Sequence, residues 1–92
     1  MLPPHMGAHP MRRYFFDLRD EQGVVSDDEG MLFSTLEAVQ DEAARALGDF
    51  ARDEVRRVSP DGGSARQLTI EVRDEVGAVM HATFSFEIKR LQ

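Results

Sequence analysis

The architecture can be inferred from one nine-residue pattern, Asp17-Leu18-Arg19-Asp20-Glu21-Gln22-Gly23-Val24-Val25, which returns 54 residues later as Glu71-Val72-Arg73-Asp74-Glu75-Val76-Gly77-Ala78-Val79. Each copy reads as the end of one strand, a four-residue acidic turn that closes with glycine, and the start of another strand. Glycine suits the last turn position because it adopts left-handed backbone conformations without a steric penalty. The repeat therefore predicts a β-hairpin on each side of the segment between the copies.

The residues around both turns alternate between apolar and polar, which is typical of half-buried strands. Residues 13–19 are expected to form the first strand, residues 24–26 a short second strand, and residues 68–73 and 79–88 the second hairpin. Residues 31–33 either extend the first pairing or lead into the helix. One face of these strands collects the apolar side chains Tyr14, Phe16, Leu18, Leu68, Ile70, Val72, Met80, Ala82, Phe84, Phe86 and Ile88.

A long helix is predicted between the hairpins. Ser34-Thr35-Leu36-Glu37 forms a capping box, in which the Ser34 hydroxyl accepts a hydrogen bond from the Glu37 amide. The helix should run to about Val58, with an apolar stripe at helical spacing: Leu36, Val39, Ala43, Leu47, Phe50 and Val58. The sequence thus predicts an α+β fold of order ββαββ, a four-stranded antiparallel sheet of two hairpins with one long helix packed on one face. It leaves the strand order open.

Composition indicates a single small domain. Residues 1–11 carry three of the four prolines and no periodicity, so we expect a disordered leader there and one α+β domain over residues 12–90. The absence of cysteine removes disulfides and thiolate metal sites. No apolar run approaches the length of a membrane span and no signal peptide is visible, so a cytoplasmic protein without a membrane partner is expected.

The charge of the chain disfavours nucleic acid as a partner. The net charge is −6 with a single lysine, Lys89, whereas affinity for a phosphate backbone comes from clusters of lysine and arginine. Residues 17–29 alone hold six acidic residues and one arginine. Asp27-Asp28-Glu29 in this stretch could hold a hard cation, but the spacing of a calcium loop is missing, and aspartate and glycine favour turns. We therefore interpret these acids as turn residues and assign no metal, cofactor or catalytic residue.

The helix also carries a second stripe of mostly small residues, Ala44, Gly48, Ala51 and Val55. Glycine inside a helix costs about 1 kcal/mol relative to alanine, which suggests that Gly48 allows a close approach. Two interpretations stay open. Either the helix lies tightly on its own sheet, or a partner subunit covers it on a second side.

The sheet face away from the helix is the other candidate surface. Alternation places the apolar residues Phe15 and Val79 there among polar ones, and with the small-residue stripe they form a possible interaction surface. Asp17, Arg73 and His81 form a possible ligand face. A hydrolase built on His81 and Ser85 is disfavoured, because four strand residues separate the two side chains by about 13 Å.

The chain resembles a family of small bacterial proteins catalogued as domain of unknown function 6894. The resemblance covers about residues 12–88 and rests on three segments: Arg13-Tyr14-Phe15-Phe16-Asp17-Leu18-Arg19-Asp20, Asp27-Asp28-Glu29-Gly30 and Leu36-Glu37-Ala38. Many members carry histidine where this chain has Asp17. The resemblance implies the fold but no activity, ligand or partner.

These observations favour a non-enzymatic protein-interaction or regulatory module that acts as a homodimer and contacts a protein partner of unknown identity. The alternative is a small-ligand or metal-binding protein, or an enzyme, that uses the polar outer sheet face around His81. The two differ in where function should lie: on the helix stripe with Phe15 and Val79, or on Asp17, Arg73 and His81.

Overall fold

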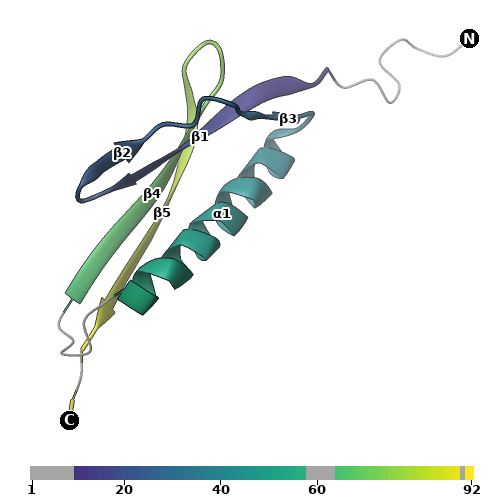
Figure 1. Ribbon diagram of the computed structural model, residues 1–92. Coiled ribbons are helices and arrows are strands. Elements are labelled where there is room, and N and C mark those ends of the chain that lie inside the picture. The colour runs from purple at the N-terminus through teal and green to yellow at the C-terminus, as the bar shows by residue number, and fades with distance from the viewer. Residues whose placement is uncertain (1–9, 58–63, 90) are drawn as a thin grey trace, which may run out of the picture.

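The computed structural model describes residues 10–57, 64–89 and 91–92, with the side chains of Val55, Arg57, Ser64 and Ala65 left aside. The expected leader over residues 1–11 therefore lies almost wholly outside the described residues. The elements follow the order β1 (Arg12–Asp20), β2 (Gly23–Val25), β3 (Met31–Phe33), α1 (Leu36–Arg57), β4 (Ser64–Arg73) and β5 (Ala78–Ile88). Figure 1 shows one helix lying along a twisted sheet.

The sheet is antiparallel with the strand order β2-β1-β4-β5, so β1 and β4 lie side by side at its centre. The hairpins β1–β2 and β4–β5 are those that the repeated pattern predicts, and the α+β class is confirmed. The strand count differs slightly, because β3 also pairs with β1, opposite Arg12 to Tyr14. Residues 31–33 thus extend the pairing of the first hairpin before the chain enters α1.

The core lies between α1 and one face of the sheet. The helix contributes Val39, Ala43 and Leu47, which are buried against alternate residues of the strands. The buried apolar strand residues are Tyr14, Leu68, Ile70 and Val72. The rings of Tyr14 and Phe16 pack on Phe33 with centroid separations of 6.3 and 5.9 Å.

The helix begins one residue later than the capping box predicts. The Ala38 amide donates to the Thr35 hydroxyl at 3.1 Å, so Thr35 and not Ser34 is the N-cap residue. Two members of the expected apolar stripe are also largely outside the core, because Leu36 is 52% and Phe50 39% exposed. Among the described residues, no helix is both long and apolar enough to cross a membrane.

The same Asp-x-x-Gly turn occurs three times within the described residues. In each, one aspartate oxygen accepts the amides two and three residues later at 2.8–3.2 Å. The turns begin at Asp20, Asp27 and Asp74 and end at Gly23, Gly30 and Gly77, all with positive φ. The first and third close the hairpins, whereas the second joins β2 to β3.

Candidate functional site

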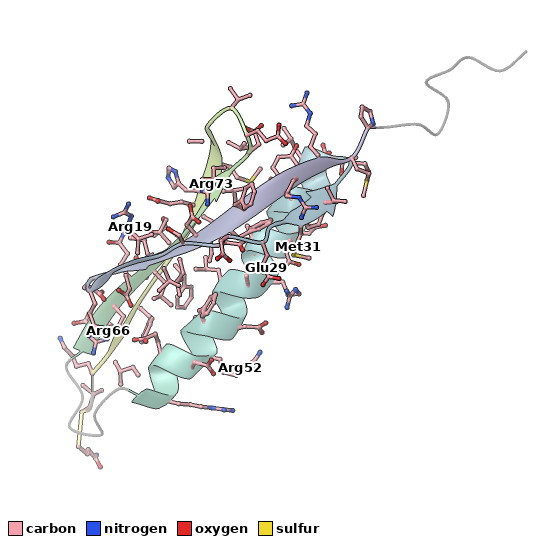
Figure 2. All side chains as sticks on the ribbon, turned by 45° about the horizontal axis from the view of Figure 1, so that its top comes forward. Arg19, Glu29, Met31, Arg52, Arg66 and Arg73 are labelled. Carbon is pink, nitrogen blue, oxygen red and sulfur yellow. The ribbon has the colours of Figure 1, made fainter. Side chains whose placement is uncertain are left out.

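The polar face of the sheet, opposite α1, brings the predicted ligand residues together. Cross-strand pairing sets Asp17 beside Glu71 and Glu71 beside His81, so the three side chains form one row across β1, β4 and β5. Arg73 lies one step along β4 on the same face. Figure 2 shows Arg19 and Arg73 on the side of the sheet away from the helix, from which Arg52 projects.

Arg73 and Asp17 form the centre of this face. The Arg73 guanidinium donates from Nε to Asp17 Oδ2 at 2.9 Å and from Nη2 to the Asp27 carbonyl at 2.8 Å. The Asp27 amide in turn donates to Asp17 Oδ1 at 2.9 Å. Asp17 is buried, and its carboxylate is occupied from both sides, so it acts as a connector between β1, β4 and the segment before β3.

Asp27 holds that segment against β1. Its Oδ2 accepts the Phe16 amide at 3.1 Å, while Oδ1 closes the turn to Gly30. Partial burial raises the pKa of Asp27, but the amides of Phe16, Gly30 and Glu29 outweigh it and hold the pKa below its ordinary value. These contacts favour the turn interpretation of the acids. Within the described residues, no group of three or more potential ligands is placed to hold a metal ion.

A second ion pair lies on the same face. Arg19 Nε donates to Glu71 Oε2 at 2.9 Å, and this bond raises the pKa of Arg19 further above its already high ordinary value. Both side chains are about half exposed, so water screens the pair and its contribution to stability is small. Arg19 and Glu71 thus neutralise each other beside His81.

His81 is exposed at the rim of a hollow of about 430 Å³ that Asp17 and Arg73 also line. The structure thus brings Asp17, Arg73 and His81 to one hollow of the surface. Two residues along β5 from His81, the Thr83 hydroxyl is hydrogen-bonded to that of Thr69 at 3.1 Å. The described geometry provides an imidazole beside carboxylates, without an aligned nucleophile and base.

The predicted interaction surface is not continuous. Phe15 is partly buried, because the Arg73 guanidinium covers its ring. The distance from Arg73 Cζ to the centroid of the Phe15 ring is 4.5 Å. Val79 is the extra residue of a bulge, because Val72 pairs with Met80 while Arg73 pairs with Ala78, and it packs against the core. Phe15 thus lies on the outer face as expected but is partly covered by Arg73, whereas Val79 packs against the core.

The small-residue stripe divides along the helix. Ala51 is buried against the sheet, whereas Ala44 and Gly48 are exposed. A Cβ built on Gly48 would meet nothing within 4 Å, so Gly48 does not serve close packing within this chain. The Val55 side chain lies outside the described residues.

Sequence reasoning missed an apolar feature of β5. Phe84 pairs with the buried Leu68 and so belongs to the helix-covered face, yet it is 39% exposed at the edge of the sheet. Its ring lies 5.6 Å from that of Phe86. The signal was present in the sequence, since β5 contains neither proline nor lysine, the residues that commonly protect an edge strand.

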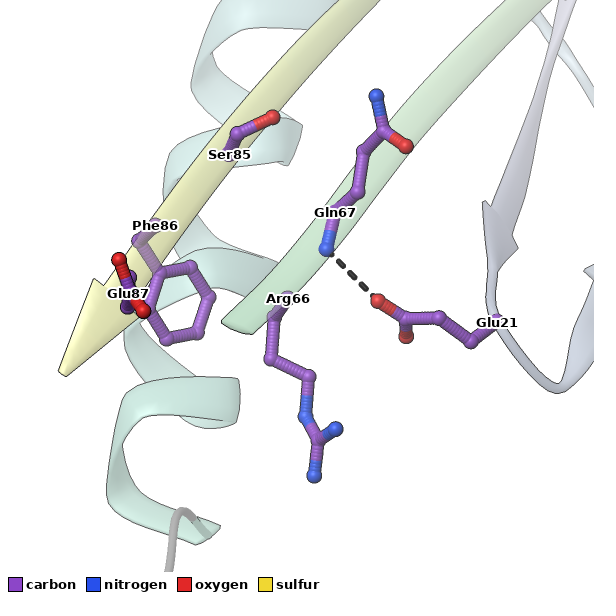
Figure 3. A pocket seen from close by; sticks show the side chains of 6 residues that line it. All are labelled: Glu21, Arg66, Gln67, Ser85, Phe86 and Glu87. Carbon is purple, nitrogen blue, oxygen red and sulfur yellow. Dashed lines mark hydrogen bonds between the residues drawn. The ribbon is translucent and has the colours of Figure 1, made fainter. Parts of the chain in front are cut away.

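A shallow hollow at the far end of the sheet has a structural explanation. Figure 3 shows the Glu21 carboxylate reaching the Gln67 amide, with an oxygen–nitrogen distance of 2.8 Å. This hydrogen bond is the main cause that lowers the pKa of Glu21 below its ordinary value. It satisfies an amide of β4 just beyond the last β1–β4 pair, Arg19 with Thr69.

A family model described as "Domain of unknown function (DUF6894)" matches residues 13–86. The match confirms the resemblance seen in the three sequence motifs. No curated protein and no solved structure matches the chain.

Proposed function

The chain belongs to the DUF6894 family. Because membership of this family implies no activity, we propose from the surfaces of the molecule that the protein is a non-enzymatic protein-interaction module that acts as a homodimer. The observation that carries this proposal is the open edge of β5. Within the described part of the chain, no strand pairs with that edge.

An open edge of this kind is unusual. It is eleven residues long and includes one formally charged residue, Glu87. Soluble proteins normally protect sheet edges with short strands, proline, lysine or bulges, because unpaired amides and carbonyls recruit other strands. The bulge at Val79 affects only the first residues of β5. As far as the structure describes the chain, the remainder is unpaired and open to strand addition, a common mode of protein recognition.

Apolar surface beside the edge adds a driving force. Phe84 and Phe86 form a pair of rings on the helix side of β5, where α1 leaves them partly uncovered. Burying exposed aromatic surface contributes about 25 cal/mol per Å². On the opposite face, Asp17, Arg73, Arg19 and Glu71 are engaged in ion pairs, which supports a structural rather than a catalytic use.

Analytical ultracentrifugation tests the proposal. At tens of micromolar we expect a species of twice the chain mass of 10.4 kDa. Phe84→Lys should convert it to monomer. Phe50→Lys is the matched control, because Phe50 is equally exposed at 39% but lies on α1 and lines the hollow beside β1 and β2. A wild-type monomer at high micromolar concentration would overturn the homodimer.

The hollow beside His81 supports a second candidate, a small-ligand site. Asp17, Arg73 and His81 line it together, and the exposed His81 imidazole offers a hydrogen-bonding group to a small polar ligand. A thermal-shift screen with carboxylates and phosphates tests this candidate, because a ligand at 100 times its Kd stabilises the native state by about 2.7 kcal/mol. We expect His81→Ala to abolish any shift. The absence of a shift throughout the screen would remove this candidate.

A further inference from the structure

We propose that two copies of this chain join through antiparallel pairing of β5 with β5 of the partner subunit, with Phe84 on the twofold axis. This inference rests on the proposed homodimer and specifies which surface forms it. The two sheets would become one continuous sheet, and the two α1 helices would lie side by side on the same face.

The register follows from the side chains of β5. Antiparallel pairing must keep the helix-covered face of both strands on one side, which restricts the possible registers to steps of two residues. With Phe84 opposite its own copy, His81 lies opposite Glu87 of the partner subunit. An imidazole N–H donates to a carboxylate in either protonation state. Because of the twofold axis, this polar pair occurs twice.

The remaining pairs in this register are also complementary. Thr83 lies opposite Ser85 of the partner subunit, and two hydroxyls can bond there as Thr69 and Thr83 do within one chain at 3.1 Å. On the helix side, the small Ala82 faces the large Phe86 of the partner subunit. Phe84 is covered by its copy, which removes from water the aromatic edge that is 39% exposed in one chain.

The neighbouring registers are poorer. With Ser85 on the axis, His81 faces Lys89 of the partner subunit, and two donor groups without an acceptor oppose each other. With Thr83 on the axis, the Glu87 carboxylate faces the apolar Val79 of the partner subunit. Charge complementarity therefore favours the register centred on Phe84.

The position of α1 fits this arrangement. The helix packs on both β4 and β5, and Figure 1 shows it running alongside them. Strands in a sheet are about 4.8 Å apart. A helix above the gap between β4 and β5 would therefore lie about 10 Å from its copy across a β5–β5 junction, and packed helices are separated by about 8–10 Å.

The small residues of α1 lie on the flank that would meet the partner helix. Phe50 and Asp53 face β1 and β2, since both line a hollow with Phe16 and Val25. Helical spacing puts Ala44 and Gly48 on the opposite flank, toward the open edge of β5. The open space at Gly48 would accommodate the second helix.

Gly48 is also level with the proposed axis. The ion pair between Glu54 and Arg66, 3.4 Å long, aligns residue 54 with the row of Arg66 and Phe86. Two strand residues span about 6.6 Å, or about four helical residues. The row of Phe84 therefore lies beside residue 50 of α1, between Gly48 and Ala51.

Single-cysteine cross-linking tests the register, because the native chain has no cysteine. Phe84→Cys should form an intersubunit disulfide under mild oxidation, since opposed residues in antiparallel strands fall within disulfide range. Thr83→Cys and Ser85→Cys should each stay largely uncoupled alone but form a mixed disulfide when combined, at least tenfold more than either alone. Self-coupling of Thr83→Cys, or no preference for the mixture, would overturn the register.

Charge exchange gives an independent readout. Glu87→Lys should raise the dimer Kd at least tenfold, because it sets a cation opposite His81 of the partner subunit. His81→Glu added to the same chain should restore the native Kd. A dimer unaffected by Phe84→Lys and by both charge variants would overturn the β5 interface while leaving the homodimer intact. A monomeric wild-type chain would overturn both proposals.

Discussion

Arg73 Nε lies 2.9 Å from Asp17 Oδ2, although 56 residues separate the two in the chain. The same guanidinium donates to the Asp27 carbonyl and stacks over the Phe15 ring. One side chain of β4 thus connects this strand both to β1 and to the segment before β3. Because Asp17 is buried and accepts bonds from both partners, removal of Arg73 leaves a carboxylate without its counter-ion.

Arg73→Met should therefore destabilise the protein substantially. We expect a loss of about 2–3 kcal/mol in the free energy of unfolding, since an uncompensated buried charge costs more than the pair contributes. Urea unfolding at neutral pH, followed by circular dichroism, measures this loss. It should be run on the same oligomeric species for variant and wild type, because subunit association adds to apparent stability.

Arg19→Met is the matched control. The Arg19–Glu71 pair has the same 2.9 Å separation but is about half exposed to water, so its loss should destabilise the protein much less than the loss of Arg73. Equal effects of the two substitutions would contradict the structural role assigned to Arg73.

Among the glycines that the structure describes, Gly30 is least able to accept a side chain. Its φ is +72°, and a Cβ there would lie 2.9 Å from the Tyr14 carbonyl oxygen and 2.8 Å from Arg13 Cγ. Gly30→Ala combines left-handed strain with a backbone clash, and we expect a loss of about 2–4 kcal/mol in the free energy of unfolding. Thermal and urea unfolding both measure it.

Gly48→Ala is the opposite case. Gly48 lies inside α1 and has no atom within 4 Å of its Cβ position, so alanine should increase the free energy of unfolding of the monomer by about 0.5–1 kcal/mol. A destabilised Gly48→Ala monomer would contradict the open space at this position.

The repeated pattern predicted both hairpins because turn chemistry is local. Asp20 and Asp74 each close their turn with their own carboxylate, which a sequence motif can encode. The third copy, Asp27 to Gly30, has the same local chemistry, but its attachment to β1 depends on the Phe16 amide eleven residues earlier. Such a contact depends on strand order, which alternation alone does not provide.

The alternation of apolar and polar residues along the strands also explains why only part of the candidate site could be predicted from the sequence. It placed Asp17, Arg73 and His81 on one face correctly, since residues two apart share a face. It failed at Val79, because the extra residue of the bulge interrupts the period of two. It could not predict the burial of Asp17, which comes from Arg73 and the Asp27 segment together.

The helix N-terminus provides a local test of the corrected cap. Thr35→Ala removes the acceptor of the Ala38 amide and should cost about 1 kcal/mol. Ser34→Ala, one residue earlier, should change the free energy of unfolding by less than about 0.5 kcal/mol, because exposed substitutions away from such contacts have small effects. Urea unfolding of both variants decides between the two capping residues, and a larger effect at Ser34 would restore the capping box.

Acid should destabilise the protein through carboxylates that accept backbone amides. The amides of Gly77 and Val76 lower the pKa of Asp74, and the amide of Gln67 lowers that of Glu21. Burial opposes the shift at Asp27, yet the pKa of this group is also lowered. In the unfolded chain these groups titrate near 3.8 for aspartate and 4.5 for glutamate.

The sign of the effect follows from proton binding. Each of these groups binds protons more weakly in the native state, so stability rises with pH in the acidic range. This contribution to stability is present above the unfolded-state pKa, which is 4.5 for Glu21 and 3.8 for the aspartates. It is lost as the pH falls through the lower pKa values of the native state. Urea midpoints should therefore be flat from pH 7 to 5 and fall steeply below 4.

Asp27→Asn should flatten this acid-dependent fall, because the amide group does not titrate. It should also lower stability at pH 7, where a neutral oxygen replaces a charged acceptor of three backbone amides. Asp28→Asn is the control, since no described backbone amide donates to the neighbouring Asp28 carboxylate. If both variants kept the wild-type slope between pH 5 and 2.5, Asp27 would not contribute to acid unfolding, and the fall would have to come from Glu21, Asp74 or other groups.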